Sequence, residues 1–185
     1  MKMKSRTRFG ISLLFTLTLI AGILFVPSVK VLCIEEAKNP SKKIYSKSGA
    51  CGFCISYTHS VNKGRVHDYY IHDGNELILY KTEFVSYGAG MPELEENPDA
   101  TFYADEERNT YTMEYSRKVG KSFLMAVGVI ADHSISFNPD YENEFFLKDF
   151  FEPQTRLKIY IKRIPMINLI AEKNIWEKTW KKKQM

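Results

Sequence analysis

The residues that could do chemistry are concentrated between positions 51 and 92. His59 and Ser60 follow one alternating segment, and Asp68 and Glu83 lie in the next two. A hairpin after His59 would bring its imidazole towards Asp68. An imidazole beside two carboxylates can ligate a metal or act as acid and base, and His133 is a weaker fourth candidate. The alternative is a hydrogen-bonded polar cluster that satisfies turn backbone groups.

Two cysteines, Cys51 and Cys54, form a C-x-x-C sequence. This spacing occurs in reactive dithiols, in half-sites for zinc and in local disulfides. Cys54 enters a predicted strand instead of opening a helix, and no second cysteine pair follows. The pattern therefore favours a structural disulfide or free buried thiols over redox catalysis or metal binding.

A glycine-rich segment ends this region with Ser86, Gly88, Gly90 and Pro92. It is too short and too apolar to be a phosphate loop. Its two glycines indicate either positive φ angles with close approach of a partner, or a structural turn after a long strand. The common catalytic motifs G-x-S-x-G, H-E-x-x-H and the P-loop do not occur, so an enzymatic function has no motif support and no cofactor is predicted.

Alternating apolar and polar residues dominate the elements that must position these groups. Strands are predicted over 53–59, 66–71, 76–85, 110–117, 135–137 and 156–164, with an Asp73-Gly74 turn between the second and third. The apolar run 123–131 is expected to be a central strand, and 88–109 a long loop. Regular alternation over 76–85 would place Leu77, Leu79 and Glu83 on one face. The fold class is therefore all-β, a compact sandwich or small barrel of about seven to nine strands.

The ends of the chain differ from its centre. Residues 9–26 contain no charged residue and follow four cations, which predicts an N-terminal membrane helix or a cleaved signal peptide over 1–30. We expect a linker over 31–50, the β domain over 51–164, and a basic amphipathic helix over 165–185. That helix either lies on a membrane surface or packs on the domain.

Charge is also unevenly placed along the chain. Residues 1–8 and 173–185 each carry a net charge of +4, so residues 9–172 sum to −4 although the whole chain is +4. This placement argues against nucleic acid as a partner and for a membrane. Cations before the apolar run predict a cytoplasmic N-terminus, with the domain on the extracytoplasmic side of the cell membrane as a single-pass protein.

Two elements of the sequence resemble a known family. Tyr57-Thr58-His59-Ser60-Val61, then Asp68, then Glu83 with Ser86-Tyr87-Gly88-Ala89-Gly90-Met91-Pro92 are similar to motifs of the family called domain of unknown function 1850. His133 fits a weaker family position. The resemblance implies a small, often membrane-anchored protein associated with TAXI-type TRAP solute transporters. Its partner would be the transporter membrane subunit or the solute-binding protein. The competing hypotheses are a metal-binding or hydrolytic domain using His59, Asp68 and Glu83, and a thiol redox protein using Cys51 and Cys54.

Overall fold

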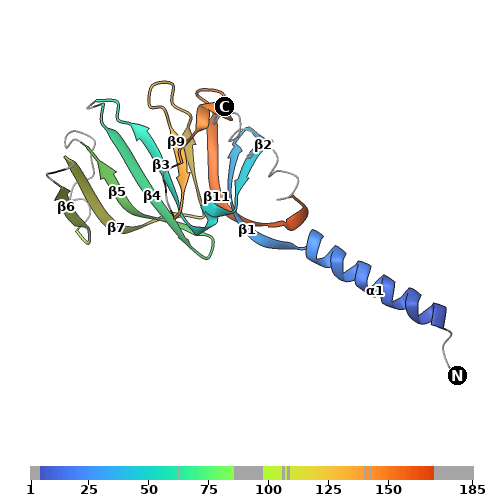
Figure 1. Cartoon of the computed structure of the whole chain (residues 1–185). Helices are drawn as coiled ribbons and strands as arrows, with labels where there is room; N and C mark the ends of the chain where they lie inside the picture. The colour runs from blue at the N-terminus through green and yellow to red at the C-terminus, as the bar shows by residue number, and fades with distance from the viewer. Residues whose placement is uncertain are drawn as a thin grey trace. The chain divides into compact units, whose positions relative to one another are not determined.

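The computed structural model describes residues 5–61, 63–85, 98–105, 107, 109–139, 141 and 143–168 (Figure 1). Helix α1 (Ser5–Phe25) is followed by eleven strands and two short 3-10 helices. The strands are β1 (Pro27–Glu36), β2 (Asn39–Ser46), β3 (Phe53–Thr58), β4 (Arg65–Asp73), β5 (Glu76–Phe84), β6 (Thr101–Asp105), β7 (Thr110–Gly120), β8 (Ser122–Ala126), β9 (Ser134–Phe137), β10 (Phe145–Phe146) and β11 (Arg156–Pro165). The 3-10 helices are η1 (Ser48–Cys51) and η2 (Leu147–Asp149).

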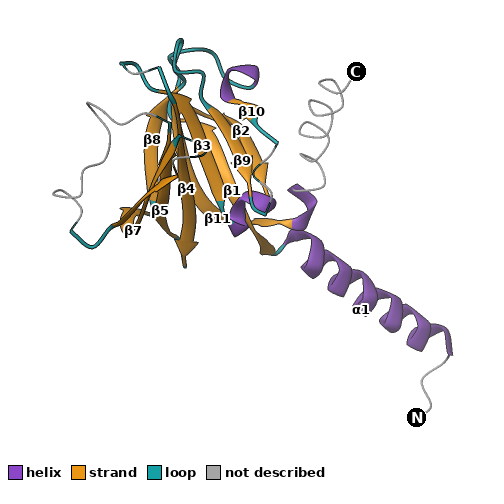
Figure 2. Ribbon diagram, turned by 60° about the vertical axis from the view of Figure 1, so that its left-hand side comes forward, coloured by secondary structure: helices purple, strands orange, loops and turns teal. Residues whose placement is uncertain are grey.

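The strands form two antiparallel sheets, which confirms the prediction of a β-rich domain (Figure 2). The predicted number of about seven to nine strands was too low, since the described residues form eleven, of which β1 and β2 lie in the segment expected to be a linker. The four-stranded sheet has the order β2-β1-β11-β8, and the seven-stranded sheet has the order β10-β9-β3-β4-β5-β7-β6. One face of each sheet contributes to a common hydrophobic core. Leu32 and Leu157 come from the first sheet, and Phe53, Leu77 and Ile135 from the second; all are at most 1% exposed. We call these the inner faces and the opposite ones the outer faces.

The chain divides into two units, residues 31–162 and the two ends outside them. In the second unit, apolar residues surround the whole circumference of α1 instead of forming one stripe. Phe9, Leu14 and Phe15 of α1 are 73%, 67% and 70% exposed. No helix among the described residues has both the length and the apolar character required to cross a membrane. A helical turn at 166–168 starts the predicted C-terminal helix, whose remainder lies outside the described residues.

Two predictions about the elements were wrong. The expected linker over 31–50 contains β1, β2 and η1 instead, and Leu32 and Ile34 of β1 are core residues. Lysines disguised this segment, because a strand with one solvated face can carry charge, as β2 does at Lys43 opposite Glu35 on the outer face. The apolar run 123–131 is not a central strand. Only its first part belongs to β8, which ends the order of its sheet, and the rest is a loop.

Strand β5 has the predicted length but not the predicted faces. Its pairing with β4 shifts by one residue, so that Tyr69 opposes Lys81 whereas Tyr70 opposes Leu79. This β-bulge leaves Tyr80 without an opposite residue on β4, and it reverses the alternation on either side. Leu77 and Leu79 therefore share the buried inner face with Thr82, while Glu83 lies on the outer face.

Candidate functional site

A polar cluster covers the outer face of strands β9, β3 and β4. Ser56 of β3 lies opposite His67 of β4 and Ser134 of β9. Residues opposite one another in a sheet share a face, so these side chains converge although they are distant in sequence. The residues between them, such as Ile55, point to the core, because alternate side chains of a strand face opposite ways.

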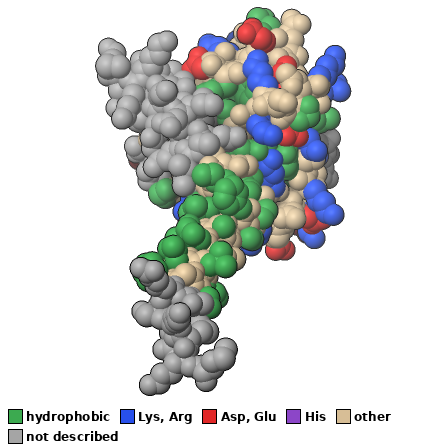
Figure 3. Space-filling model, turned by 90° about the vertical axis from the view of Figure 1, so that its right-hand side faces the viewer, with side chains coloured by type: hydrophobic (Ala, Val, Ile, Leu, Met, Phe, Trp, Pro, Cys, Tyr) green, Lys and Arg blue, Asp and Glu red, His purple; other side chains and the backbone are tan. Residues whose placement is uncertain are grey.

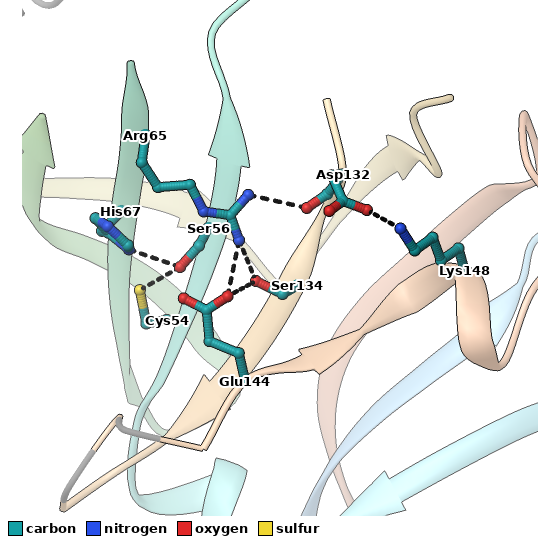
Figure 4. Close-up of polar contacts among 8 residues, drawn as sticks. All are labelled: Cys54, Ser56, Arg65, His67, Asp132, Ser134, Glu144 and Lys148. Carbon is teal, nitrogen blue, oxygen red and sulfur yellow. Dashed lines mark hydrogen bonds and ion pairs between the residues drawn. The ribbon is translucent and has the colours of Figure 1, made fainter. Parts of the chain in front are cut away.

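Ser56 and His67 form the closest contact in this cluster that resembles a catalytic pair (Figure 4). The Ser56 hydroxyl lies 2.7 Å from Nδ1 of His67, and the Cys54 thiol lies 3.6 Å from the same hydroxyl. A nucleophile beside a base is the usual arrangement for covalent catalysis. Here Ser56 and Cys54 are both only 1% exposed, so a substrate has no access to either.

Burial also determines the protonation of these groups. It lowers the pKa of His67, which favours the neutral imidazole that can share a hydrogen bond with Ser56. It raises the pKa of the Cys54 thiol to about 12, so the reactive thiolate is scarce at neutral pH. The arrangement thus satisfies buried polar groups and has the properties of a structural network.

Arg65 extends this network to two later segments of the chain. Its guanidinium donates to the Asp132 carbonyl at 3.0 Å, to the Ser134 hydroxyl at 2.6 Å and to the Glu144 carboxylate at 2.8 Å. Ser134 donates to the same carboxylate at 2.7 Å, and Lys148 pairs with the Asp132 carboxylate at 2.5 Å. Figure 4 shows how these contacts tie β4 to the segments that flank β9 and β10.

The predicted site residues His59 and Ser60 lie in the tight turn between β3 and β4. The backbone of His59 pairs with Gly64 at 2.9 Å and accepts from Lys63 at 3.1 Å. The imidazole Nδ1 accepts a hydrogen bond from the Val61 amide at 3.3 Å. Lys63 adopts φ +57° and donates its ammonium to the Ser60 carbonyl at 2.6 Å. The described contacts of His59 are therefore within its own turn.

Asp68 and Glu83 point to opposite faces of the seven-stranded sheet. Asp68 opposes Thr82, on the inner face, and accepts its hydroxyl at 2.7 Å. Glu83 opposes His67, on the outer face, and accepts from Tyr69 at 2.6 Å and Lys81 at 2.9 Å. The structure therefore does not bring the two carboxylates together. Over the residues described, no group of three His, Cys, Asp or Glu side chains could hold a metal ion.

The two carboxylates also titrate differently. Burial raises the pKa of Asp68. Burial acts in the same direction on Glu83, but hydrogen bonds from Lys81 and Tyr69 outweigh it and lower the pKa of that group. Glu83 is thus held as a carboxylate by its neighbours, whereas the environment of Asp68 favours the protonated acid.

The remaining predicted residues lie elsewhere. His133 accepts the Gly128 amide at 3.0 Å and lies beside the Tyr57 ring, with 5.7 Å between the ring centres. Burial lowers the pKa of His133. Cys51 is a free, exposed thiol and Cys54 a free, buried one. The glycine-rich segment, with Ser86, Gly88, Gly90 and Pro92, lies outside the described residues.

An exposed apolar surface, which the sequence did not predict, lies at one end of the seven-stranded sheet. Val61 in the β3–β4 turn is 69% exposed, and Val129 and Ile130 in the loop before β9 are 65% and 77% exposed. We call these three residues the apolar tip. The Thr58 amide donates to the Ala131 carbonyl at 2.7 Å and joins the two loops. Gly128, which interrupts the apolar run 123–131, and Asp132, which follows it, were the signal that the last part of the run is a loop.

Strand β5 also ends on this side of the sheet. β3 ends and β4 begins at the turn that carries Val61, and Phe84, the last residue of β5, opposes Val66 near the start of β4. Val85 follows and is 37% exposed. The two sequence motifs, the turn around His59 and the segment that starts at Ser86, are therefore connected to the same end of the sheet as the apolar tip.

Comparison with known proteins identifies the domain but not a characterised relative. No curated protein and no solved structure matches the chain. The model of a protein family described as a domain of unknown function, DUF1850, matches residues 53–142. This match extends from the first residue of β3 to the segment after β9. It includes the His59 turn, the apolar tip and the polar cluster as far as Ser134, but not Glu144 or Lys148. The chain therefore carries a DUF1850 domain over residues 53–142.

Proposed function

We propose that the protein is an extracytoplasmic binding module that assists a TAXI-type TRAP solute transporter. The apolar tip is its contact surface, and the transporter membrane subunit or its solute-binding protein is the partner. The observation that carries the binding role is the exposure of three large aliphatic side chains on two loops that hydrogen bonds hold together. Exposed apolar patches on such a scaffold are typical of protein–protein contact sites.

The rigidity of the support favours recognition over chance exposure. Arg65 binds the Asp132 carbonyl at 3.0 Å, directly after the loop that carries Val129 and Ile130. The Thr58–Ala131 hydrogen bond anchors the same end of the loop, and at its start the Gly128 amide donates to Nδ1 of His133 at 3.0 Å. A contact surface that is already ordered loses little conformational entropy on binding. The polar cluster therefore holds the loops of the apolar tip in place.

The proposed partner and location rest on the sequence. The family resemblance implies the transporter association. The uncharged run 9–26, preceded by four cations, supports a single-pass anchor with the N-terminus in the cytoplasm and the domain outside it. In this arrangement the β domain lies on the outer side of the membrane, where a transporter in the same membrane can reach it.

The test is co-purification of the tagged full-length protein from its native membrane in mild detergent. We expect a TRAP membrane subunit or its solute receptor among the recovered proteins. Val129→Asp with Ile130→Asp should reduce that recovery by roughly tenfold or more, because a charge is then buried in the contact. His59→Ala, which removes a turn side chain beside Val61, should reduce it less.

The control is Ile71→Asp, which adds one negative charge, against two in the test variant, to a residue of β4 that is 39% exposed and far along the strand from the tip. Circular dichroism of all variants establishes that the fold is kept. Unchanged recovery for the Val129 and Ile130 variant would remove the apolar tip as the contact surface. Recovery of the protein alone, under conditions that keep the transporter assembled, would refute the transporter association.

A further inference from the structure

The outer face of the four-stranded sheet combines cations with tyrosines. In β1 and β2, Cys33 lies opposite Tyr45 and Glu35 opposite Lys43. In β11 and β8, Lys158 lies opposite Leu124. Their neighbours Leu32, Ile34, Leu157 and Ile159 point to the core, so alternation places the polar set on the other side. We call this set the basic face: Lys43, Tyr45, Leu124, Arg156, Lys158, Tyr160 and Lys162.

The tyrosine rings support the lysines of this face. The ammonium of Lys162 lies 4.7 Å from the ring centre of Tyr45 and 5.4 Å from that of Tyr160. The ammonium of Lys158 lies 5.1 Å from the Tyr160 ring, and that of Lys43 lies 6.0 Å from the Tyr45 ring. Such contacts hold the aliphatic stems against the sheet and keep the charges at its surface.

The acid on this face does not neutralise the cations. The carboxylate of Glu35 accepts a hydrogen bond from the Tyr160 hydroxyl at 2.8 Å, and that hydroxyl oxygen accepts one from the Lys162 ammonium at 3.3 Å. The ion pairs found between described residues involve none of the cations Lys43, Arg156, Lys158 and Lys162. The positive charge of the face is therefore available to a partner.

The basic face is opposite in sign to the rest of the domain. Its four cations and Glu35 sum to +3, whereas residues 9–172 as a whole sum to −4, so the remainder of that segment is −7. Figure 3 shows Lys and Arg side chains in blue spread over the side of the domain where β1, β2 and β11 lie in Figure 1. Charge separation of this kind orients a protein on an oppositely charged surface.

We infer that the basic face binds the anionic headgroup surface of a lipid membrane. The half-buried Lys43, Lys158, Tyr160 and Lys162 and the exposed Arg156 spread over an area, as a planar surface requires, while Tyr45 is buried among them. Clustered lysine and arginine side chains attract anionic headgroups, and tyrosine is enriched at the membrane interface. Leu124, 56% exposed, adds an apolar contact. At the end of the sheet, an open hollow of about 730 Å³ lined by Lys38, Leu124 and Arg156, with Glu36 beside them, could receive one headgroup.

The position of β1 in the chain favours lipid over another anionic partner. Phe25, the last residue of α1, is separated from Pro27, the first residue of β1, by one residue. This part of the inference rests on the membrane anchor proposed above. If the apolar segment is held in a membrane, a connection of this length keeps the start of β1 within roughly 7 Å of the segment's end. The lipid surface is then always present at high effective concentration.

The experiment uses the full-length protein reconstituted into vesicles of phosphatidylcholine alone or with one third phosphatidylglycerol. Lysines are acetylated with an amine-reactive reagent and quantified by mass spectrometry. We expect labelling of Lys43, Lys158 and Lys162 to fall several-fold in the anionic vesicles and to recover in high salt. Lys63 and Lys118 should be labelled equally in both. Equal labelling of the basic face in the two vesicles would overturn the inference.

A charge-reversal set provides the second measurement. Lys43→Glu, Lys158→Glu and Lys162→Glu together should abolish the lipid-dependent difference in labelling at Lys38, while Lys47→Glu, Lys63→Glu and Lys118→Glu should leave it unchanged. Flotation on phosphatidylcholine vesicles tests the anchor separately, because it does not depend on anionic lipid. Protection of the basic face by an acidic polypeptide but not by phosphatidylglycerol would refute the lipid assignment in favour of a protein partner.

Discussion

Buried polar side chains in this domain are satisfied by partners on neighbouring strands. Ser56, 1% exposed, shares a 2.7 Å hydrogen bond with His67, and Ser134, fully buried, bonds both Arg65 and Glu144. A buried polar group left without a partner costs more than the bond itself contributes. Removing one partner of such a hydrogen bond should therefore destabilise the fold, because the other partner is left buried and unsatisfied.

Ser56→Ala should destabilise the protein by about 1–3 kcal/mol, because it leaves Nδ1 of His67 buried without its partner. The measurement is the free energy of unfolding in urea, followed by circular dichroism in mild detergent. Ser60→Ala, at an exposed position in the same hairpin, is the control and should change little. Equal stability of the Ser56 variant and the unmodified protein would show that a water molecule or another group replaces the hydroxyl.

Two histidines give the protein a dependence on pH. Burial lowers the pKa of both His67 and His133 below the value of about 6.5 for an unfolded chain. Between the lowered pKa and that value, the unfolded chain binds more protons than the folded one. Stability from these groups is therefore complete above about pH 6.5 and is lost as the pH falls towards the folded pKa.

Replacing His67 by Gln should reduce this acid sensitivity, since Gln keeps a hydrogen-bonding group near Ser56 but does not titrate. The free energy of unfolding is measured from about pH 7.5 to 5, the range in which an ordinary histidine titrates. The unmodified protein should lose more stability over this range than the variant. Parallel curves for the two proteins would mean that His67 does not contribute to the pH dependence.

The three cysteines should differ sharply in reactivity. Cys51 is exposed, while Cys33 and Cys54 are buried. Burial raises the pKa of Cys33, and it raises the pKa of Cys54 to about 12, against 9.0 for an ordinary thiol, which reduces its thiolate about a thousandfold. Maleimide should label one thiol in the native protein, at Cys51, and all three after unfolding. Absence of native labelling at Cys51 would indicate a disulfide between Cys51 and Cys54.

At the scale of elements, local alternation predicted the central strands but not their partners. β3, β4 and β5 agree with the predicted segments to within about two residues, as does the Asp73-Gly74 turn, where Gly74 has φ +59°. Leu77 and Leu79 share one face as predicted, but the placement of Glu83 with them was wrong. A bulge depends on the neighbouring strand, which periodicity within one segment does not contain.

The candidate site was only partly predictable for the same reason. The strand position of Asp68 follows from local pattern, and its surroundings do not. Arg65 and Glu144, which form an ion pair of the cluster at 2.8 Å, are 79 residues apart in the chain. No spacing rule relates residues at such a distance, so only the order of strands reveals that they meet. The apolar tip is likewise formed by two loops that are distant in sequence.

The loop before β9 depends on a glycine. A Cβ atom added at Gly128 would lie 2.8 Å from the Cβ of Ala131 and 2.9 Å from Cε1 of His133. Gly128→Ala should therefore displace this loop, cost about 1–3 kcal/mol of stability and weaken partner binding at the apolar tip. Gly22→Ala, where nothing lies within 4 Å, is the matched control. If both variants unfold at the same urea concentration, the loop adjusts to the added methyl group without loss of stability.

On the scale of the whole domain, stability comes from a core that belongs to both sheets. Leu157 and Ile159 of β11 are fully buried and belong to the same hydrophobic cluster as Phe53 and Ile135 of the other sheet. Either sheet on its own would expose its apolar inner face to water, and only the other sheet buries that face. The two sheets should consequently fold as one cooperative unit.

Leu157→Ala should lower the free energy of unfolding by about 2–5 kcal/mol through the cavity it creates. Hydrogen exchange should show that amides of β4, in the other sheet, lose protection to the same extent as those of β11. The exposed residue Leu124, replaced by Ala, serves as the control and should have a small effect. Persistent protection of β4 in the Leu157 variant would mean that the seven-stranded sheet is stable on its own.

The β-bulge in β5 also determines where the strand can lose a residue without turning its core side chains to the other face. Tyr80 has no opposite residue on β4, and the strand returns to regular pairing on both sides of it. Loss of one codon at this position would leave Leu77, Leu79, Thr82 and Phe84 on the same side of a continuous strand. Loss of a codon at Glu83 instead would move Phe84 to the opposite side. In-frame deletions among homologous genes should therefore be tolerated at Tyr80 and removed by selection a few codons away.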